Sequence, residues 1–578
     1  MGVRSRSRKA YGVIALVAIL ALSFSATAAF GAVAFEDADF SGYATGTVLH
    51  ADALQTGPSP DGLRLADVEE AFTGSAVDSK GLTTIKNEMD RVVSTAAATK
   101  RSSGRGSGLE VGLAHAPDAE NDIILADAAH AVAPPSTGVI TNDLLDIPGS
   151  PLVYASVLRG QAQALWANDQ CILGRDVAFG KGHAADAQLL NLPPSETNAD
   201  DSFKTPLLAA DADEPDRNVA SSYSHNFMDV QKNAAGKPIG TNWGLSSEAR
   251  MTIAPITLFK GTPNELTIEV AGEWVLRAAA GGIAGSAHIF YGPGDVNLQT
   301  PILRVLQDNE VLGQLLFQDI FGPGGLDQLV IPGLLEVAIG EDPRAIGGDA
   351  SSSPSVAANG TSASAAVDVV RVKLLDDSLG MHIADLRVGH MEVKTQVPAG
   401  GIDCGIPVTK SANPPGVTIN QAFVVTIKID NPFGCDLTGV KVVDDITTTG
   451  DAKFEVLSTN PQANTVPEGS NLDHGSIVWN NIGAIPKGGS KSVTTTIRAQ
   501  GGGGVIKDIA DVSAVLGNCE GSGEGNAIVG KSLPLQVPVV LKLKLPPTGV
   551  GTSSATVLGA LMLLSLAGVT IRQIRRHA

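Results

Sequence analysis

The sequence predicts an all-β chain with a large β-rich body followed by a smaller β-sandwich. Only 4% of the 578 residues are aromatic, whereas 65 are glycine and 32 are proline. This composition favours many short elements joined by turns over a helical fold. Several segments alternate apolar and polar residues with a period of two, which is the pattern of a strand with one buried face.

The first 34 residues have the features of a secretory signal peptide. Four basic residues in the first nine positions precede an apolar stretch at 13–24, and small residues follow. This order is typical of a segment that is removed on export. We expect cleavage after Ala34, with Ala28 as the alternative position.

The exported part of the chain would be strongly acidic. Removal of residues 1–34 and 549–578 leaves 34 basic against 60 acidic residues, a net charge of −26. Phosphate binding needs clustered lysine and arginine, so this charge argues against nucleic acid as a partner. Its simpler role is to keep an exported protein soluble.

The region from residue 35 to 403 is expected to form the body. Its clearest strand is 266–276, where five apolar residues share one face. A further strand at 370–374 is joined by a hairpin connection at 376–380 to the segment 386–393, whose alternation changes parity at Gly389. A one-residue change of parity at glycine predicts a β-bulge. The apolar face of the first strand comprises Leu266, Ile268, Val270, Trp274 and Leu276, and the segments 82–93 and 152–166 fit either a helix or a strand.

No catalytic motif was found in the body. GxSxG, HExxH and phosphate-loop motifs are absent, and histidines do not occur in ligand-like pairs. The acidic residues within 211–216 have the oxygens that calcium requires, but Pro215 and the lack of a glycine favour a solvated loop. The sequence therefore predicts no catalytic residue, no metal site and no cofactor. Three histidines in or beside strand-like segments are expected to be structural: His288, His382 and His390.

The region 404–544 alternates more regularly and predicts a compact β-sandwich. About seven short strands separated by proline and glycine turns are typical of that architecture. The expected strands lie at 406–412, 423–430, 440–445, 477–479, 493–497, 510–514 and 533–543.

The C-terminal residues 545–578 resemble the sorting signal of wall-anchored proteins of Gram-positive bacteria. A pentapeptide is followed by an uncharged run at 557–571 and by three arginines. The resemblance implies that a sortase cleaves after Thr548 and joins Thr548 to peptidoglycan. The uncharged run covers about 22 Å as a helix, so residues from Gly549 onward would complete a span, and the arginines would stop transfer. The recognised residues would be Leu545, Pro546, Pro547, Thr548 and Gly549.

Two further resemblances concern the exported part. The start of the body, FEDADFSGYATG at 35–46, resembles the actinobacterial choice-of-anchor G family, over roughly residues 35–400. It implies surface exposure and no catalytic residues. The order KSANPPG, then an alternating strand ending in asparagine, then VKVVDD and GGS resembles the conserved-repeat, immunoglobulin-like domain of bacterial surface proteins. It implies a spacer or display module.

Four cysteines lack CxxC spacing, so a zinc site is not expected. In an oxidising exterior an even number suggests disulfides, and four cysteines allow three connectivities. If 423–430 is strand B and 506–516 is strand F of the immunoglobulin-like fold, Cys435 and Cys519 lie in loops at one end of the sandwich. We therefore expect a Cys435–Cys519 bond, which leaves Cys171 to pair with Cys404.

Some wall-anchored immunoglobulin-like domains carry a lysine–asparagine or lysine–aspartate isopeptide bond between their first and penultimate strands. Lys410 with Asp508 or Asp511 has a matching placement along the chain. Lysine at that position is common in the repeat family, so an ordinary lysine is the favoured interpretation.

These observations predict a sortase-anchored, non-enzymatic protein of a Gram-positive, actinobacterial cell surface with a structural or adhesive role. Its expected partners are sortase, peptidoglycan and an unknown surface ligand. A wall-anchored enzyme acting on glycan or peptide is one alternative, and paired carboxylates across a groove in the body would favour it. A minor pilus subunit is another, although the Tyr-Pro-Lys motif of shaft pilins is absent.

Overall fold

The computed structural model describes residues 32–541 except for a number of short stretches. In the described residues strands are the regular elements, and no helix is present that is long and apolar enough to cross a membrane. The stretches left out are 56–63, 88, 90, 116–122, 148–152, 169, 186–187, 192–205, 211–218, 259–262, 264, 294–300, 308–309, 317–327, 332–334, 340–353, 375–381 and 522–523.

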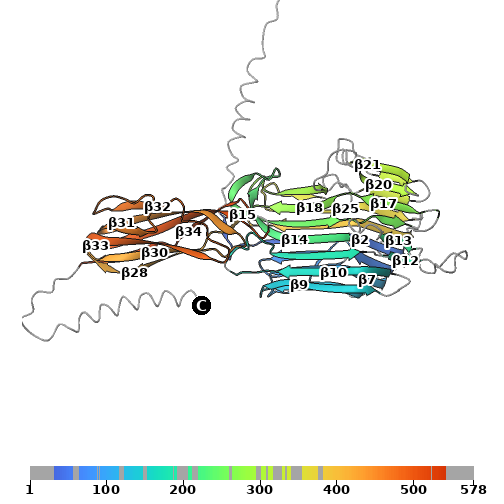
Figure 1. Ribbon diagram of the computed structural model, residues 1–578, viewed down its shortest axis with the longest axis horizontal. Helices are drawn as coiled ribbons and strands as arrows, with labels where there is room; N and C mark the ends of the chain where they lie inside the picture. The colour runs from blue at the N-terminus through green and yellow to red at the C-terminus, as the bar shows by residue number, and fades with distance from the viewer. Residues whose placement is uncertain are drawn as a thin grey trace, which may run out of the picture.

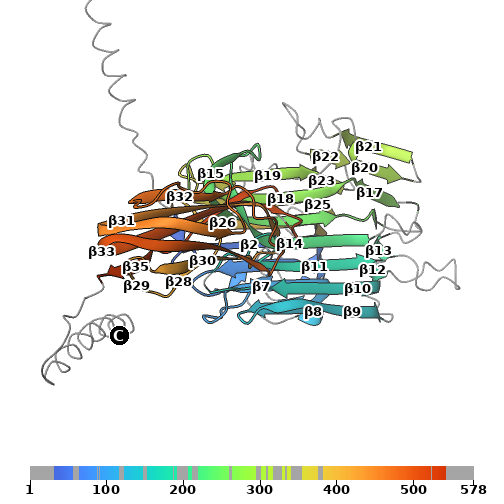
Figure 2. The same ribbon diagram turned by 60° about the vertical axis from the view of Figure 1, so that its left-hand side comes forward.

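The fold is all-β, as the sequence predicts. Two large sheets form the body, and a third sheet forms the module that follows it. Figure 1 shows the two parts end to end along the longest axis, and the turned view in Figure 2 shows the module coming forward from the end of the body. The change from body to module falls between strands that end at Asp403 and begin at Val408.

Sheet A of the body has fifteen strands. They are β1 (Val33–Ala34), β9 (Thr137–Ile147), β10 (Val153–Ala164), β11 (Ala178–Ala185), β12 (Gln188–Asn191), β13 (Pro206–Ala210), β14 (Val219–Lys232), β15 (Pro238–Thr252), β16 (Ile256–Leu258), β17 (Leu266–Val270), β18 (Glu273–Ala280), β19 (His288–Pro293), β20 (Pro301–Gln307), β21 (Glu310–Leu316) and β27 (Ile402–Asp403).

Sheet B of the body has ten strands, and two short strands pair separately. Sheet B comprises β2 (Ser41–Gln55), β3 (Arg64–Glu70), β4 (Thr73–Asp78), β7 (Ser102–His115), β8 (Ile123–Ala133), β22 (Gln328–Ile331), β23 (Leu335–Ile339), β24 (Ser355–Val356), β25 (Ser362–Leu374) and β26 (His382–Gln396); the separate pair is β5 (Ile85–Lys86) with β6 (Val92–Ser94).

One part of the body's interior is an apolar core between the two sheets. Sheet A contributes Met251 and Trp274, and sheet B contributes Leu49, Val388 and Met391, all buried in one cluster. Removing this much apolar surface from water is the main stabilising term of the fold. The core joins strands that are more than 300 positions apart in the sequence, such as β2 and β26.

Another part of the interior brings the backbones of the two sheets into direct contact. A Cβ atom placed on Gly106 of β7 would lie 2.0 Å from the carbonyl oxygen of Lys181 on β11, and one on Gly180 of β11 would lie 1.8 Å from that of Arg105. A Cβ atom on Gly104 would likewise lie 2.0 Å from the carbonyl oxygen of Phe179. No side chain fits at these positions, so we call this contact between β7 and β11 the glycine seam.

Small hydroxyl side chains fill the space beside the glycine seam. The Thr73 Oγ1 atom lies 2.7 Å from the hydroxyl oxygens of both Ser222 and Ser224. Thr45 donates to the Thr73 carbonyl over 2.8 Å. Because these groups satisfy one another, they can be buried without the cost of unpaired polar atoms.

Two details of the predicted body strands are wrong. The segment 266–276 forms two strands, β17 and β18, because Gly272 has a φ of +85° and interrupts the extended chain. The predicted bulge is absent: β26 keeps the same register with β2 and β25 on both sides of Gly389, which has a φ of +71° and faces Val369. The five apolar residues predicted to share a face are all buried.

The remaining body predictions have mixed outcomes. The segment 152–166 is strand β10, and 82–93 contains β5 and the start of β6. The strands flanking the predicted hairpin, β25 and β26, pair in antiparallel fashion. The connection at 376–380 lies outside the described residues.

The module is an eight-stranded β-sandwich. Its first strands agree with the prediction, but β31 and β33 are far longer than expected, with 25 and 28 residues. The predicted strands at 493–497 and 510–514 are therefore parts of one hydrogen-bonded strand. The module comprises β28 (Val408–Asn413), β29 (Val417–Thr418), β30 (Ala422–Asp430), β31 (Asp436–Asn460), β32 (His474–Trp479), β33 (Ser490–Gly517), β34 (Ala527–Lys531) and β35 (Leu535–Val540).

Strand β33 begins and ends at the same end of the module. Ser490 pairs with Asp430, Gly517 pairs with Asp436, and these two partners flank the same short connection. The strand therefore runs out, turns over through the glycine run 501–504, and returns. Its first half pairs with β30 in one layer, and its second half pairs with β34 and β35 in the other. Strand β31 pairs with β33 along both halves and shifts register at Gly450.

Candidate functional site

A short segment of the body locks into the end of the module. Cys171 forms a disulfide with Cys404. Two residues further on, the Leu173 carbonyl accepts a hydrogen bond from the Gly434 amide over 2.8 Å, and the Gly174 carbonyl accepts one from Gly521 over 2.7 Å. A Cβ atom on Gly174 would collide with the Cys435 sulfur at 2.0 Å, so only glycine fits here.

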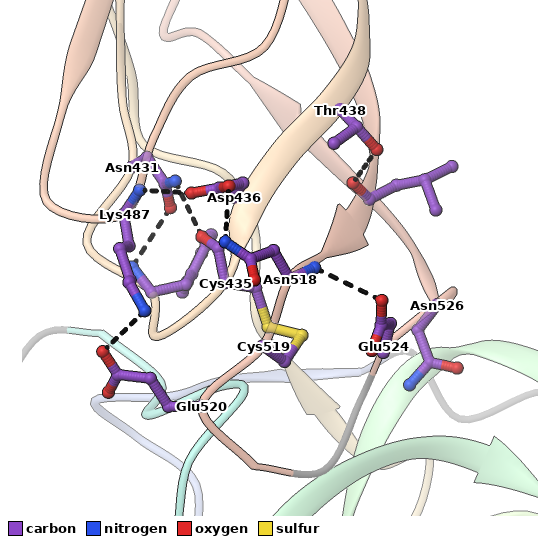
Figure 3. The surroundings of a disulfide bond; sticks show 12 residues. Asn431, Cys435, Asp436, Thr438, Lys487, Asn518, Cys519, Glu520, Glu524 and Asn526 are labelled. Atoms are coloured by element: carbon purple, nitrogen blue, oxygen red, sulfur yellow. Dashed lines mark hydrogen bonds and ion pairs between the residues drawn. A yellow bond between two sulfur atoms is a disulfide. The ribbon is translucent and has the colours of Figure 1, made fainter.

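The second disulfide closes the same end of the module. Cys435 and Cys519 are bonded across 84 residues, with hydrogen bonds around them that Figure 3 shows. Asn431 donates to the Cys435 carbonyl over 2.9 Å, and Asn518 donates to the Asp436 carboxylate over 3.2 Å. The two disulfides are the pairs expected from the sequence. Disulfides persist in oxidising compartments, so the chain is consistent with an extracellular or surface location.

One apolar cluster runs through this junction. Phe35 and Trp243 of the body and Phe433 of the module are buried in the same core. The Asn526 side chain of the module also donates to Asp229 of the body over 2.9 Å. The two parts are therefore joined by a covalent bond, backbone hydrogen bonds and a shared core.

The expected signal cleavage residue lies inside this junction. Ala34 belongs to β1, which pairs in parallel with β27, and the Val33 amide donates to the Gly401 carbonyl over 3.0 Å. Cleavage after Ala34 would remove this strand, whereas cleavage after Ala28 would retain it. The residues of the expected sorting signal, Leu545, Pro546, Pro547, Thr548 and Gly549, and the run 557–571 lie outside the described residues.

A lysine lies between two aspartates inside the module. The Lys410 Nζ atom of β28 contacts an oxygen of Asp444 on β31 and an oxygen of Asp508 on β33. The three side chains are 1%, 0% and 1% exposed. Lys410 extends from one layer of the sandwich and the aspartates from the other. We call these three residues the lysine cluster.

The lysine cluster has unusual electrostatics. Burial raises the pKa of Asp444 well above its usual range, the negative charge of Asp508 raises it further, and Lys410 opposes both effects. The outer Oδ2 atoms of both aspartates are buried without a hydrogen-bond partner among the described residues. A carboxyl that stays protonated can donate a hydrogen bond or a proton.

The sequence identified only part of this cluster. Of the two aspartates proposed for Lys410, Asp508 is in contact, whereas Asp511 is half-exposed and paired with Lys531. Asp444 was missed as a partner. Asp444 follows Val440 and Val442 at intervals of two residues, so it lies on the same buried face of the strand. A charged residue on a buried face needs a partner, and this spacing could have identified Asp444.

The body contains two buried histidines held by carboxylates. His390 lies 2.6 Å from Asp368 and 2.8 Å from Glu392. His225 lies 2.8 Å from Asp176 and 3.0 Å from Glu248. Burial alone would lower both pKa values, but the carboxylates outweigh it and raise both, that of His390 to about 9.

The predicted structural role is confirmed for His390, which is buried and fully paired. His288 is partly buried in β19, and burial lowers its pKa. The side chain of His382 and the acidic residues at 211–216 lie outside the described residues. In the part of the chain that the structure describes, no group of three or more His, Cys, Asp or Glu side chains is arranged to hold a metal.

Comparisons with known proteins give little further identification. No family model and no curated protein matches the chain. Among solved structures, the N-terminal domain of the Streptococcus gordonii adhesin Sgo0707 aligns with 72% of this chain and 86% of that chain, at 6% identity and a TM-score of 0.15. A Salmonella alpha-2-macroglobulin mutant aligns with 89% of this chain and 38% of that chain, at 11% identity and a TM-score of 0.16.

Proposed function

We propose that this chain is a sortase-anchored cell-surface protein with a non-enzymatic, structural or adhesive role, and that it belongs to the choice-of-anchor G proteins of actinobacteria. In this proposal the module is a rigid spacer that carries the body away from the wall. Sortase and peptidoglycan are the partners at Thr548, and a surface ligand contacts the body.

The observation that carries the proposal is the locked junction between body and module. A flexible connection would let the body fold back toward its attachment point. Here the Cys171–Cys404 disulfide and the hydrogen bonds of Leu173 and Gly174 hold the two parts in line. An interface with a shared apolar core and a covalent bond favours a fixed arrangement over free domain motion.

The direction of the chain supports the same function. Lys410 lies on the strand that enters the module from the body, and β35 ends at Val540 beside Gly504, at the opposite end of the module. The LPPTG pentapeptide follows only four residues after the last described position. Attachment at Thr548 would therefore place the body at the far end of the molecule from the wall.

One cavity in the described part of the body lacks the paired carboxylates that would favour the enzymatic alternative. It has a volume of about 170 Å³ and is lined by one carboxylate, Asp229. That carboxylate is paired with Lys232 at 2.7 Å and with Asn526 of the module. Glycoside hydrolysis uses two carboxyl groups on either side of the scissile bond, and this cavity does not offer such a pair.

The experiment that tests the proposal is mass spectrometry of the C-terminal peptide from walls digested with a muramidase. We expect a fragment that ends at Thr548 and carries a wall cross-bridge. An uncleaved chain recovered with membranes and continuing through Arg576 would contradict wall attachment. A Thr548→Ala variant serves as the control, because it should remain in the membrane fraction.

A further inference from the structure

We propose that the cavity beside Asp229 binds a sugar ring that carries a carboxylate, and that Arg277 holds this carboxylate. The cavity lies on the body next to the module, because Asp229 lines it and accepts a hydrogen bond from Asn526. The inference gives a chemical class to the surface ligand of the proposed function, and it rests on that function for its role on the cell. Binding of a soluble sugar needs no wall, so the two proposals can fail separately.

The cavity is a hollow in the outer face of sheet A, over β14, β15 and β18, which lie side by side in Figure 1. Ser247 of β15 donates to the Lys394 carbonyl of sheet B over 2.8 Å, so its neighbour Ser246 lies on the opposite, outer face. Across the sheet, Ser246 pairs with Ala279 of β18, and Ala279 pairs with His288 of β19. Small side chains on the two central strands thus form the floor between taller neighbours.

The size of the cavity admits one small ring. Sites for drug-sized ligands measure about 300–1,000 Å³, so a volume of about 170 Å³ is too small for an extended chain. Phe290 also lines the cavity, and it is 42% exposed. An exposed aromatic ring beside polar groups suits a ligand with one apolar and one polar face, as a pyranose ring has.

Arg277 brings unused hydrogen-bond donors to the cavity. Its Nε atom lies 3.3 Å from Glu248, and its guanidinium lies over the Phe290 ring at 5.6 Å from the centroid. The two terminal nitrogens of Arg277 have no acceptor among the described residues. Glu248 is shared with Arg250 and with His225, so it offsets the charge of Arg277 only in part. A planar guanidinium with free donors recognises a carboxylate through two parallel hydrogen bonds.

The other charged groups that line the cavity are satisfied within the protein. Both oxygens of Asp229 accept from Lys232, at 2.9 and 2.7 Å, and Asn526 donates to one of them. Burial lowers the pKa of His288, so its imidazole is neutral at neutral pH. The charge left for a ligand is therefore the positive charge of Arg277, which favours an anion.

Ser246 offers the ligand a hydroxyl that the protein leaves unused. Ser246 is 4% exposed and lines the cavity. In the part of the chain that the structure describes, no hydrogen-bond partner meets its Oγ atom. A hydroxyl of a bound sugar can take the place of water there. The neutral His288, which lies in the same row of the sheet, can donate to or accept from another hydroxyl.

The test is saturation-transfer NMR of the purified exported chain with matched methyl glycosides. The probes are the methyl glycosides of glucuronate and galacturonate, each beside that of glucose or galactose, which lacks the carboxylate. We expect a uronate to bind, and its neutral counterpart to bind about tenfold more weakly, because it loses charge-assisted hydrogen bonds. Absence of saturation transfer to both uronates, or equal binding of charged and neutral glycosides, would overturn the proposal.

A further probe separates a sugar from the C-terminus of a peptide. N-acetylalanine carries a carboxylate without a sugar ring, so it should bind more weakly than the better of the two uronates. Equal or tighter binding of N-acetylalanine would overturn the assignment to a sugar.

Four variants locate the binding. Arg277→Gln should remove the preference for uronates, with a loss of about tenfold in their affinity, and Arg277→Lys should retain part of it, because it keeps the charge without the planar fork. Ala279→Leu fills the floor of the cavity and should abolish binding of all the glycosides. Arg304→Gln on β20 is the control. Arg304 is similarly exposed and is paired with Glu269 at 2.8 Å outside the cavity, so this variant should bind like the wild type.

Circular dichroism and the thermal midpoint report whether each variant has folded. A preference for uronates that persists in folded Arg277→Gln would overturn the role of Arg277. Binding that persists in folded Ala279→Leu would place the site elsewhere and overturn the proposal. Because the soluble chain is used, none of these outcomes depends on attachment at Thr548.

Discussion

The body and the module hold two layers of strands together in different ways. In the module, large apolar side chains such as Phe423, Phe454 and Trp479 fill the space between the layers. In the glycine seam of the body, the backbone of β7 lies directly against that of β11. A core of large side chains tolerates substitutions of similar volume, whereas a contact between backbones has no side chain to adjust.

The largest effect is expected at the glycine seam. Gly106→Val would force the two sheets apart, because the new side chain meets the Lys181 backbone, and we expect a loss of more than about 5 kcal/mol. Thermal unfolding of the full chain measures it. Gly138→Ala on β9 is the control, since a Cβ there has open space and should change stability by less than about 0.5 kcal/mol. Equal stability of the two variants would contradict the backbone contact.

The next largest loss of stability is expected when the disulfide of the module is removed. Cys435→Ser with Cys519→Ser opens a loop of 84 residues, which the chain-entropy model values at about 4 kcal/mol. The fluorescence of Trp479, the one tryptophan in the module, follows the transition. An unchanged denaturation midpoint would show that the module's apolar core suffices alone.

A third prediction is that the stabilities of the body and the module depend differently on pH. The pKa of His390 is about 9 in the folded body against an ordinary value of 6.5. Its stabilisation is therefore complete below pH 6.5 and is lost as the pH rises through 9, by about 3 kcal/mol. The raised pKa of His225 acts in the same direction. The module's histidine, His474, is exposed, so the unfolding of the module should lack the contribution of a buried, charged histidine.

Hydrogen exchange at pH 6 and pH 9 measures this difference region by region. In His390→Gln the pH dependence of the body should shrink, whereas His474→Gln should leave it unchanged. A body whose protection is the same at both pH values would contradict the ion pairs of His390 with Asp368 and Glu392.

The smallest effect is expected at the surface of the module. Lys531 and Asp511 form a pair at 3.1 Å, with both side chains about half exposed or more. Solvent-exposed pairs contribute little, so Lys531→Ala should change stability by less than about 1 kcal/mol. Urea denaturation checks this value. A larger loss would mean that the module depends on its surface charges as well as on its interior.

Local alternation predicted the strands well, and contacts distant in sequence explain what it missed. Phe423, Val425 and Ile427 identified β30 from their spacing alone. In the sequence, the glycines at 104 and 106 only add to the glycine content that favours turns. Their close contact with the backbone of β11, more than 70 residues away, cannot be seen from local spacing. The break at Gly272 depends on a positive φ that no spacing reveals. Similarly, the continuity of β33 through residues 501–504 depends on its pairing with β31.

The residues of the candidate site could likewise be predicted only in part, because some of their contacts depend on which strands lie side by side. The resemblance to wall-anchored immunoglobulin-like domains offered Asp508 and Asp511 as alternatives for Lys410, and the structure places Asp508 in contact with it. Asp444 required knowledge of which strand lies beside β33, since register places it diagonally across from Asp508. The Cys435–Cys519 disulfide followed from the fold expected for the module, which places both cysteines in loops at one end of the sandwich, and Cys171–Cys404 was the pair that remained.

The course of β35 determines how the module responds to tension. Leu535 pairs with Asp508 and Val539 with Gly504, so β35 points away from the body toward the far end of the module. A force that pulls the C-terminal end away from the body acts along this strand, whereas its hydrogen bonds lie across it. The five residue pairs with β33, and the parallel pairs of β29 with Val539 and Val540, are then loaded in shear and must break together. Pulling the same strand sideways would open them one at a time.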